Sequence, residues 1–351
     1  MDNMTRQQNL LVNPEDLKFG LDTFGDVTDG DYVKGLKNVV EQAKLADQVG
    51  LYTFNVGEHH RDDYGISAPD TVLSHIAGVT ENIHLGTAVI VLSSDDPVRI
   101  YERFSTIQAL SGNRVQLTVG RGSFIESFPL FGYSLSDYEE LFEEKLGMLV
   151  EIVNNRPVTW QGKHTQSLEE QEIWPPLDKD KMPIYVAVGG SPQSVVRAAK
   201  HDLGLRLAII GGAVSRFAPF ADLYRRAQEE FGHEPGKSVG WHSHGLVADT
   251  DEEAVEAFYE KHVAHVTRLG NERGWGAMTP ERFNHELRSG ALFVGSPETV
   301  ARKITKGIKA LGADSFDLKI GTGSQEAILK SIELYGTKVV PMVRDMIADG
   351  E

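Results

Sequence analysis

Short apolar runs alternate with amphipathic segments along almost the whole chain, and this alternation is the feature that most constrains the fold. We expect strands near residues 18–22, 53–57, 83–92, 115–120, 183–188, 205–210, 239–247 and 315–320. The expected helices include 36–49, 98–109, 138–153, 195–200, 217–231, 252–267 and 326–347. Eight strands that alternate with helices predict an α/β fold of the (β/α)8 type, which is also called a TIM barrel. An open doubly wound sheet is the alternative, but its GxGxxG motif does not follow the first strand.

The chain length of 351 residues suits one barrel. We expect a single domain over residues 18–347, preceded by a polar N-terminal extension of residues 1–17. Three connections are longer than usual: 122–135 after the fourth strand, 156–182 before the fifth and 270–295 before the eighth. Such insertions commonly shape the substrate pocket of a barrel, and surface decoration is the alternative for 156–182.

Composition excludes several classes of function. The formal net charge of -16 argues against a nucleic-acid partner. The chain has no cysteine, which excludes disulfides, thiolate metal sites and cysteine nucleophiles. No apolar run has the length of a membrane span, and the N-terminus is too polar for a signal peptide. We therefore expect a cytoplasmic protein without membrane association.

Several expected helices begin with capping signals. The signals are Asp96-Pro97, Ser191-Pro192, Ser296-Pro297 and Thr250 with Glu253. Ser191 also follows Gly189 and Gly190 at the end of an expected strand, where a helix N-terminus offers free N–H groups and partial positive charge. This arrangement predicts a phosphate cradle, to which Ser194 and Arg121 would add a hydroxyl and a guanidinium. A plain helix cap is our interpretation for Ser296.

His59 is the principal candidate for proton transfer, because it follows the second strand at the end where barrels place their active sites. Side-chain alternation points His59 into the barrel with Asn55 and sends Glu58 and His60 the other way. The same alternation places further polar residues inside: Asp22, Gln116, Thr118, Asp317 and Lys319. A polar interior indicates either a bound polar ligand or mutually satisfied buried groups.

A metal site is not expected. His242 and His244 share one face of the seventh strand, but metal-dependent hydrolase barrels use such a pair on the first strand. The other strand ends supply no clear further set of carboxylate and histidine ligands.

The chain resembles the bacterial luciferase-like family of flavin-dependent monooxygenases over about residues 18–343. The motifs that carry the resemblance are Glu58-His59-His60, the run 86–92 with 97–99, Gly120-Arg121-Gly122, Gly190-Ser191 with Ser194, and the late segment 293–300. The resemblance implies FMN at the barrel mouth, with a non-proline cis peptide at Ala88–Val89 against the flavin ring. It implies that Arg121, Ser191 and Ser194 hold the phosphate beside Gly120 and Gly190, although strand alternation alone would point Arg121 outward. It also implies that His59 acts as acid or base.

The resemblance further implies a two-component enzyme, in which a partner reductase supplies reduced FMN and O2 oxidises a small organic substrate. The flavin would carry the redox chemistry, while the protein excludes water and positions His59. A homodimer is expected on the same ground. An F420-dependent oxidoreductase is one alternative, and a flavin-binding protein without turnover is another.

One motif departs from the luciferase sequences, and one loop allows two interpretations. Arg61, Asp62 and Asp63 follow the two histidines where luciferases carry an aromatic residue, so light emission is not expected. We interpret these three residues as a solvated turn, with a substrate contact as the alternative. The aromatic residues of the loop after the fourth strand predict either an apolar lid or a packed minor core: Phe124, Phe128, Phe131 and Tyr133.

Overall fold

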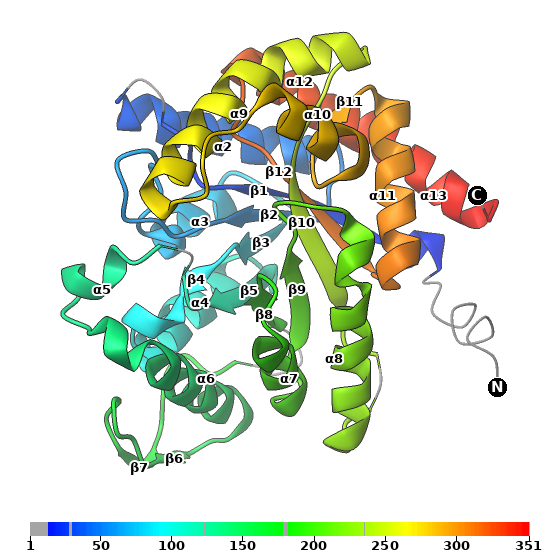
Figure 1. Cartoon of the computed structure of the whole chain (residues 1–351). Helices are drawn as coiled ribbons and strands as arrows, with labels where there is room; N and C mark the ends of the chain where they lie inside the picture. Colours follow the sequence, from blue (N-terminus) through cyan, green and yellow to red (C-terminus); the bar gives the residue numbers. More distant parts are fainter. Residues whose placement is uncertain (1–12, 28–29, 123, 178–181, 235, 351) are drawn as a thin grey trace.

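The computed structural model describes residues 13–27, 30–122, 124–177, 182–234 and 236–350. Within these residues parallel strands close into an eight-stranded barrel, which confirms the predicted fold (Figure 1). In order around the barrel the strands are β1 Lys18–Thr23, β2 Thr53–Val56, β3 His84–Thr87, β5 Val115–Gly120, β8 Ile184–Val188, β9 Gly204–Ala208, β10 Val239–Val247 and β12 Ser315–Lys319. The β9–β10 pairing, which sets Leu205 beside Val239, closes the ring.

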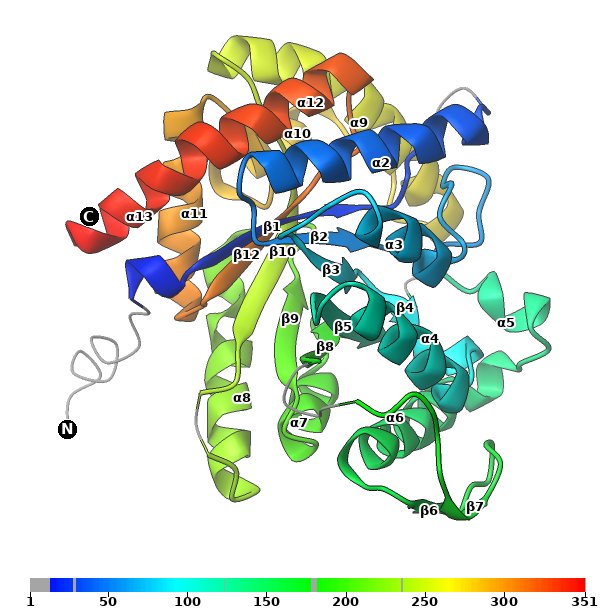
Figure 2. The same ribbon diagram turned by 180° about the vertical axis from the view of Figure 1, so that it is seen from behind.

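Helices cover the outside of the barrel. The longer ones are α2 Tyr32–Gln48, α3 Pro69–Ala77, α4 Pro97–Leu110, α6 Tyr138–Asn154, α7 Pro192–Lys200, α8 Ala218–Glu230, α9 Asp251–Arg273, α10 Pro280–Ser289, α11 Pro297–Leu311, α12 Gln325–Leu334 and α13 Val340–Ala348. Seen from behind, α2, α3 and α4 follow one another around the barrel, with α12 beside α2 (Figure 2). None of the helices in the described part of the chain is long and apolar enough to span a membrane.

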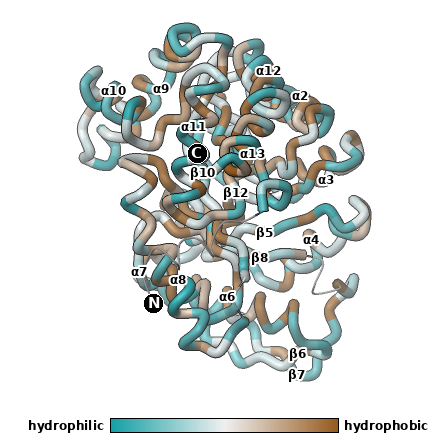
Figure 3. Tube along the Cα trace, turned by 90° about the vertical axis from the view of Figure 1, so that its right-hand side faces the viewer, coloured by the Kyte–Doolittle hydropathy of each residue, from teal (hydrophilic) through white to brown (hydrophobic). Residues whose placement is uncertain are grey.

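Strand alternation separates the apolar core from the barrel interior. On β2, Phe54 and Val56 are fully buried in the hydrophobic core, whereas Thr53 and Asn55 are buried with hydrogen-bond partners. Brown, hydrophobic segments therefore gather along the strands and the helix sides that face them, and teal segments lie on outer turns (Figure 3). The alternation along the strands therefore places polar side chains inside the barrel and apolar ones between the strands and the helices.

The helix caps that the sequence predicts are present. The side chains of Asp96, Ser191, Thr250 and Ser296 each accept a hydrogen bond from a backbone N–H of the first helical turn. Each bond satisfies one donor that the helix itself leaves without a partner.

Several predicted boundaries are wrong for identifiable reasons. The expected third strand, 83–92, breaks after Thr87 at the cis peptide and resumes as β4 Ile90–Val91, followed by the 3-10 turn Leu92–Ser94. The segment before Ser296 is a strand as well as a cap, because β11 Phe293–Gly295 pairs with β10. The expected helix 326–347 contains a π turn, Tyr335–Val339, just before Pro341, which has no N–H to donate to the preceding turn.

The long connections contain structure of their own. The stretch 156–182 holds the hairpin β6 Val158–Trp160 and β7 Leu168–Gln171, and 270–295 holds the end of α9 and all of α10. The stretch 122–135 holds α5 Ser127–Leu130. Of the expected N-terminal extension, residues 1–12 lie outside the described residues, Pro14–Asp16 form a 3-10 turn, and Leu17 packs in the core.

Gly86 on β3 tests the packing of the barrel interior. A Cβ at this position would lie 1.9 Å from Asn55 Oδ1 and 3.1 Å from Gln116 Nε2. We therefore expect Gly86→Ala to lower the free energy of unfolding by about 1–3 kcal/mol, as overpacking does. Urea unfolding measures the change, with Gly78→Ala as the control because its Cβ would meet only His75 O, at 3.6 Å. Equal losses in the two variants would contradict this packing.

Candidate functional site

A cavity of about 340 Å³ opens at the carboxyl ends of the strands, within the size range of small-molecule sites. Five of the residues predicted from the sequence line it: His59, Ala88, Val89, Gly120 and Arg121. The other three do not line the cavity: Gly190, Ser191 and Ser194. They follow Gly189 in the chain, and Gly189 is a lining residue. The sequence therefore located one wall of the cavity and the start of the adjacent helix α7.

The cis peptide Ala88–Val89 is present, as the resemblance implied. The backbone around it is held by Glu58, whose N–H donates to Val89 O at 3.0 Å and whose Oε2 accepts from Val91 N–H at 2.8 Å. Gly120 lies beside this segment, where a Cβ would meet the Val89 side chain at 2.8 Å. Glu58 therefore points away from His59, as alternation predicted, and fixes the segment that forms the cavity wall.

His59 lies among aromatic rings. Its ring centroid is 4.5 Å from those of Phe24 and Tyr64 and 5.1 Å from that of Phe124. Its Nε2 is buried with no hydrogen-bond partner within the described residues. Burial, with a smaller contribution from the positive charge of Lys319, lowers the pKa of His59 to about 3. The imidazole is therefore uncharged at neutral pH and offers a ligand one unused nitrogen.

Arg121, which lines another part of the cavity, belongs to a cluster of positively charged groups. Arg121 contacts Glu139 of α6, and Arg197 of α7 contacts the same carboxylate through Nη2 at 3.3 Å. Arg197 also donates to Ser194 Oγ at 3.4 Å, and Ser191 Oγ accepts from Ser194 N–H at the N-terminus of α7. Two guanidinium groups thus meet at the Glu139 carboxylate, and Arg197 also contacts Ser194 at the N-terminus of α7. Guanidinium groups beside a helix N-terminus form an environment that suits a phosphate.

Sequence analysis missed Arg197 and Glu139 in this group. Arg197 stands three residues after Ser194 on α7, a spacing that puts two side chains on one helix face and is the signal that was available. Glu139 belongs to an acidic run on α6, and nothing in the sequence distinguishes it from the neighbouring Glu140.

The floor of the cavity is a buried polar network inside the barrel. Asp22 accepts hydrogen bonds at both carboxylate oxygens, from Asn55 Nδ2 at 2.9 Å and from His242 Nδ1 at 2.5 Å. Asn55 Oδ1 accepts from Thr53 Oγ1 at 2.9 Å and from Gln116 Nε2 at 3.1 Å. Asp22 and His242 both line the cavity. Some of the interior polar groups therefore satisfy one another, while others line the cavity and are open to a ligand. The sequence offered these two interpretations as alternatives, and both apply.

Not every group of this floor is satisfied. Asp317 Oδ1 and Arg206 Nε are buried without a hydrogen-bond partner among the described residues, and both side chains line the cavity. Burial and the nearby Asp22 charge raise the pKa of the Asp317 carboxyl well above its ordinary value.

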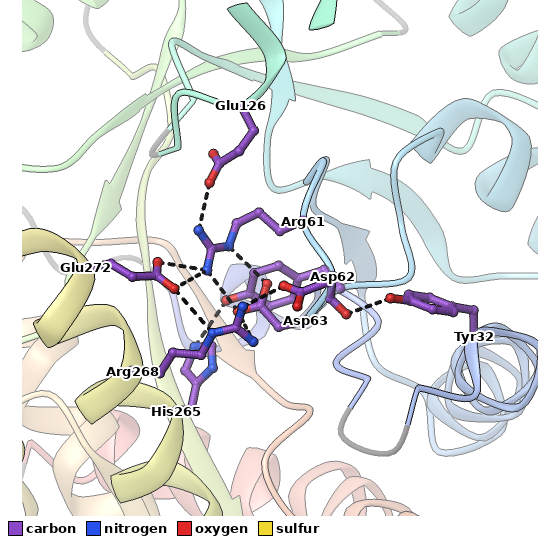
Figure 4. A network of polar contacts seen from close by, with 9 residues as sticks. Tyr32, Arg61, Asp62, Asp63, Glu126, His265, Arg268 and Glu272 are labelled. Atoms are coloured by element: carbon purple, nitrogen blue, oxygen red, sulfur yellow. Dashed lines mark hydrogen bonds and ion pairs between the residues drawn. The ribbon is translucent and has the colours of Figure 1, made fainter. Parts of the chain in front are cut away.

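Arg61 lies in a buried ion network and not in a solvated turn, which corrects the sequence interpretation. Only 8% of its side chain is exposed, and it contacts Asp63 at 3.0 Å, Glu126 at 2.7 Å and Glu272 at 2.9 Å. These contacts join the loop after β2 to the loop after β5 and to α9 (Figure 4). Arg61 also lies 4.6 Å above the ring of Phe124, so the network fixes the aromatic wall of the cavity.

The aromatic residues of the loop after β5 divide between the two predicted roles. Phe124 lines the cavity, as a lid would. Phe128 is fully buried and stacks on Tyr138, as in a minor core, whereas Phe131 is half exposed.

The histidines do not gather into a metal centre. No group of three or more histidine, aspartate or glutamate side chains with metal-binding geometry exists among the described residues. His244 and His265 instead line the cavity, and His265 Nε2 lies 3.1 Å from the Tyr64 hydroxyl.

Comparison with known proteins agrees with this geometry. The family described as luciferase-like monooxygenase matches residues 17–315. The chain belongs to this family. It is 28% identical over 294 residues to N-acetyl-S-alkylcysteine monooxygenase of Bacillus subtilis, covering 77% of this chain and 82% of that protein. It is 21% identical over 341 residues to the alkanal monooxygenase alpha chain of Photorhabdus luminescens, covering 88% of this chain and 92% of that protein.

Solved structures of this luciferase-like fold are similar over nearly the whole chain. The oxygenating constituent of 3,6-diketocamphane monooxygenase from Pseudomonas putida, in complex with FMN, superposes with a TM-score of 0.76 at 19% identity, covering 93% of this chain and 98% of that one. An F420-dependent secondary alcohol dehydrogenase in complex with an F420–acetone adduct gives a TM-score of 0.74 at 18% identity. The superposition covers 94% of this chain and 99% of that one. These likenesses establish the fold.

The lowered pKa of His59 predicts a pH dependence of stability. The unfolded chain protonates this imidazole near pH 6.5, whereas the folded protein does so only near pH 3, so stability falls as the pH is lowered through this window. We expect His59→Phe to flatten the dependence by up to about 1.4 kcal/mol per pH unit between these values.

Urea unfolding at several pH values measures this slope. Phe124→Leu is the control, because it removes a ring from the same cluster without changing the number of imidazoles. An unchanged slope in His59→Phe would show that His59 is accessible to protons in the folded state.

Proposed function

We propose that this protein is an FMN-dependent monooxygenase that receives reduced FMN from a separate reductase and uses O2 to oxidise a small organic substrate. The observation that carries the proposal is the single cavity with two unlike ends. One end has Arg121, which Glu139 connects to Arg197 on the adjacent helix α7, and the other has the aromatic residues around His59. Such a cavity suits a flat molecule with a phosphate tail.

The residues present fit FMN in several respects. The phosphate would replace the Glu139 carboxylate between Arg121 and Arg197, while the Ala88–Val89 segment would lie against the ring system. His59 Nε2, which has no protein partner in the described part of the chain, would hydrogen bond to the cofactor or the substrate. Bound reduced FMN supplies the two electrons with which one oxygen atom of O2 enters the substrate and the other leaves as water.

The substrate end of the cavity favours apolar molecules. Phe24, Tyr64, Phe124 and Trp275 all line it, and the Arg61 network holds the wall that includes Phe124. These rings exclude water from the reacting centre, which is the contribution a protein makes to flavin–oxygen chemistry. The reductase partner, the homodimer and the cytoplasmic location stay expectations from the sequence.

Spectroscopic titration with FMN and with F420, each oxidised and reduced, tests the proposal. We expect FMN to bind and its reduced form to be reoxidised by O2. Preferential binding of F420 would favour an F420-dependent oxidoreductase, which the F420-dependent neighbour makes the second candidate. Binding without reoxidation would favour a flavin carrier, and no binding of either would contradict a flavin-type site.

Glu139→Gln tests the position of the phosphate. The variant removes a negative charge that occupies the anion site, so we expect FMN to bind about fivefold more tightly, equivalent to roughly 1 kcal/mol. Ser191→Asp adds a charge at the N-terminus of α7 and should weaken binding. Glu140→Gln is the control, since Glu140 pairs with Lys163 and His164 and not with either arginine. Identical affinities in Glu139→Gln and Glu140→Gln would place the phosphate elsewhere.

A further inference from the structure

His242 differs from the other cavity histidines in its partner. His59 Nε2 and His244 Nδ1 are buried without hydrogen-bond partners among the described residues. Burial lowers the pKa of His59 to about 3 and that of His244 well below its ordinary value. His242 alone of these three contacts a carboxylate, with 2.5 Å between its Nδ1 and Asp22 Oδ2.

The Asp22 contact fixes the tautomer of His242. An ionised carboxylate only accepts hydrogen bonds, and both Asp22 oxygens do so, which places the imidazole proton on Nδ1. Nε2 then carries the lone pair. About 19% of the His242 side chain is exposed, and the residue lines the cavity. A carboxylate that orients an imidazole in this way leaves the second nitrogen available as a base.

The position of Asp22 is itself determined by the floor network. Asn55 Oδ1 is occupied by Thr53 and Gln116, so the amide can only present Nδ2 to Asp22 Oδ1. Asp22 Oδ2 therefore faces His242. Two further polar side chains, Arg206 and Asp317, line the same floor.

We propose that His242, positioned by Asp22, is the residue that exchanges a proton with the ligand in this cavity. The inference rests on the proposed function. In the reoxidation of reduced FMN to FMN, two electrons and two protons pass to O2, which becomes hydrogen peroxide. His242 Nε2 accepts one of these protons and returns it to the oxygen, while Nδ1–H stays bonded to Asp22. The imidazole ends neutral, so the protein neither gains nor loses a proton.

Asp22→Asn tests the positioning role without removing the imidazole. Asn55 can only donate a hydrogen bond to residue 22, because its own Oδ1 is occupied. The amide introduced by Asp22→Asn must therefore turn its carbonyl oxygen to Asn55 and its NH2 group to His242. Nδ1 then accepts, and the proton moves to Nε2. Nitrogen NMR of 15N-histidine-labelled protein without any cofactor measures this tautomer, and the signal lost in His242→Asn assigns it. An unchanged tautomer in Asp22→Asn would overturn the role of Asp22.

Stopped-flow reoxidation of protein-bound reduced FMN by O2, without organic substrate, tests the proton transfer. We expect the reaction of the FMN-loaded protein to be about 100-fold slower in His242→Asn and Asp22→Asn, which is the usual contribution of an acid–base group. His242→Asn retains an N–H that can donate to Asp22, which favours folding. His262→Asn is the matched control, because His262 is buried against Phe258 and does not line the cavity.

The outcomes separate this inference from the proposed function. Wild-type rates in both variants, with an active wild-type protein, would overturn the assignment of His242 and leave the monooxygenase function intact. Failure of the wild-type protein to bind FMN would overturn the function, and the proton-transfer role with it, whereas the tautomer measurement would still decide whether Asp22 orients His242.

Discussion

The hydrogen bonds of Asn55 are the constraint on which the barrel interior depends. This one buried amide accepts from Thr53 and Gln116 and donates to Leu21 O and Asp22, so it joins β1, β2 and β5. A buried polar group without partners costs more free energy than a satisfied one contributes. The glycine at position 86 leaves the space the amide needs. The hydrogen bonds of Asn55 therefore offset the cost of burying these polar groups, and they give the cavity a polar floor.

The ends of the cavity differ because different elements supply them. At one end Arg121 follows β5 and Arg197 belongs to α7, and their shared carboxylate keeps two positive charges close together. At the other end rings surround His59, and the buried Arg61 network joins three distant segments around those rings. Charge at one end and apolar rings at the other orient any amphipathic ligand in one direction, which is a stronger constraint than the shape of the cavity alone.

The sequence predicted the barrel, the helix caps and the location of the cavity wall, because these follow from local patterns. Alternation on β2 is sufficient to separate Phe54 from Asn55, and Ser191-Pro192 is sufficient to cap α7. The pairing of Arg121 with Glu139 and of Asp22 with His242 could not be predicted, since each joins residues far apart in the chain. The interpretation of Arg61 was wrong for the same reason: its charge suggested solvent exposure, but the partners that allow its burial come from the loop after β5 and from α9.

His59 in the wall of the cavity and His242 on its floor differ in their surroundings, and the proposed proton exchange at His242 follows from this difference. An imidazole surrounded by rings, such as His59, gains nothing from becoming charged, because no carboxylate compensates the lost hydration. Water exclusion and proton transfer therefore make opposite demands on one side chain. In the proposal two side chains share these demands: His59 lies among the aromatic rings of the wall, while His242 lies where β1 supplies a carboxylate that Asn55 holds in place.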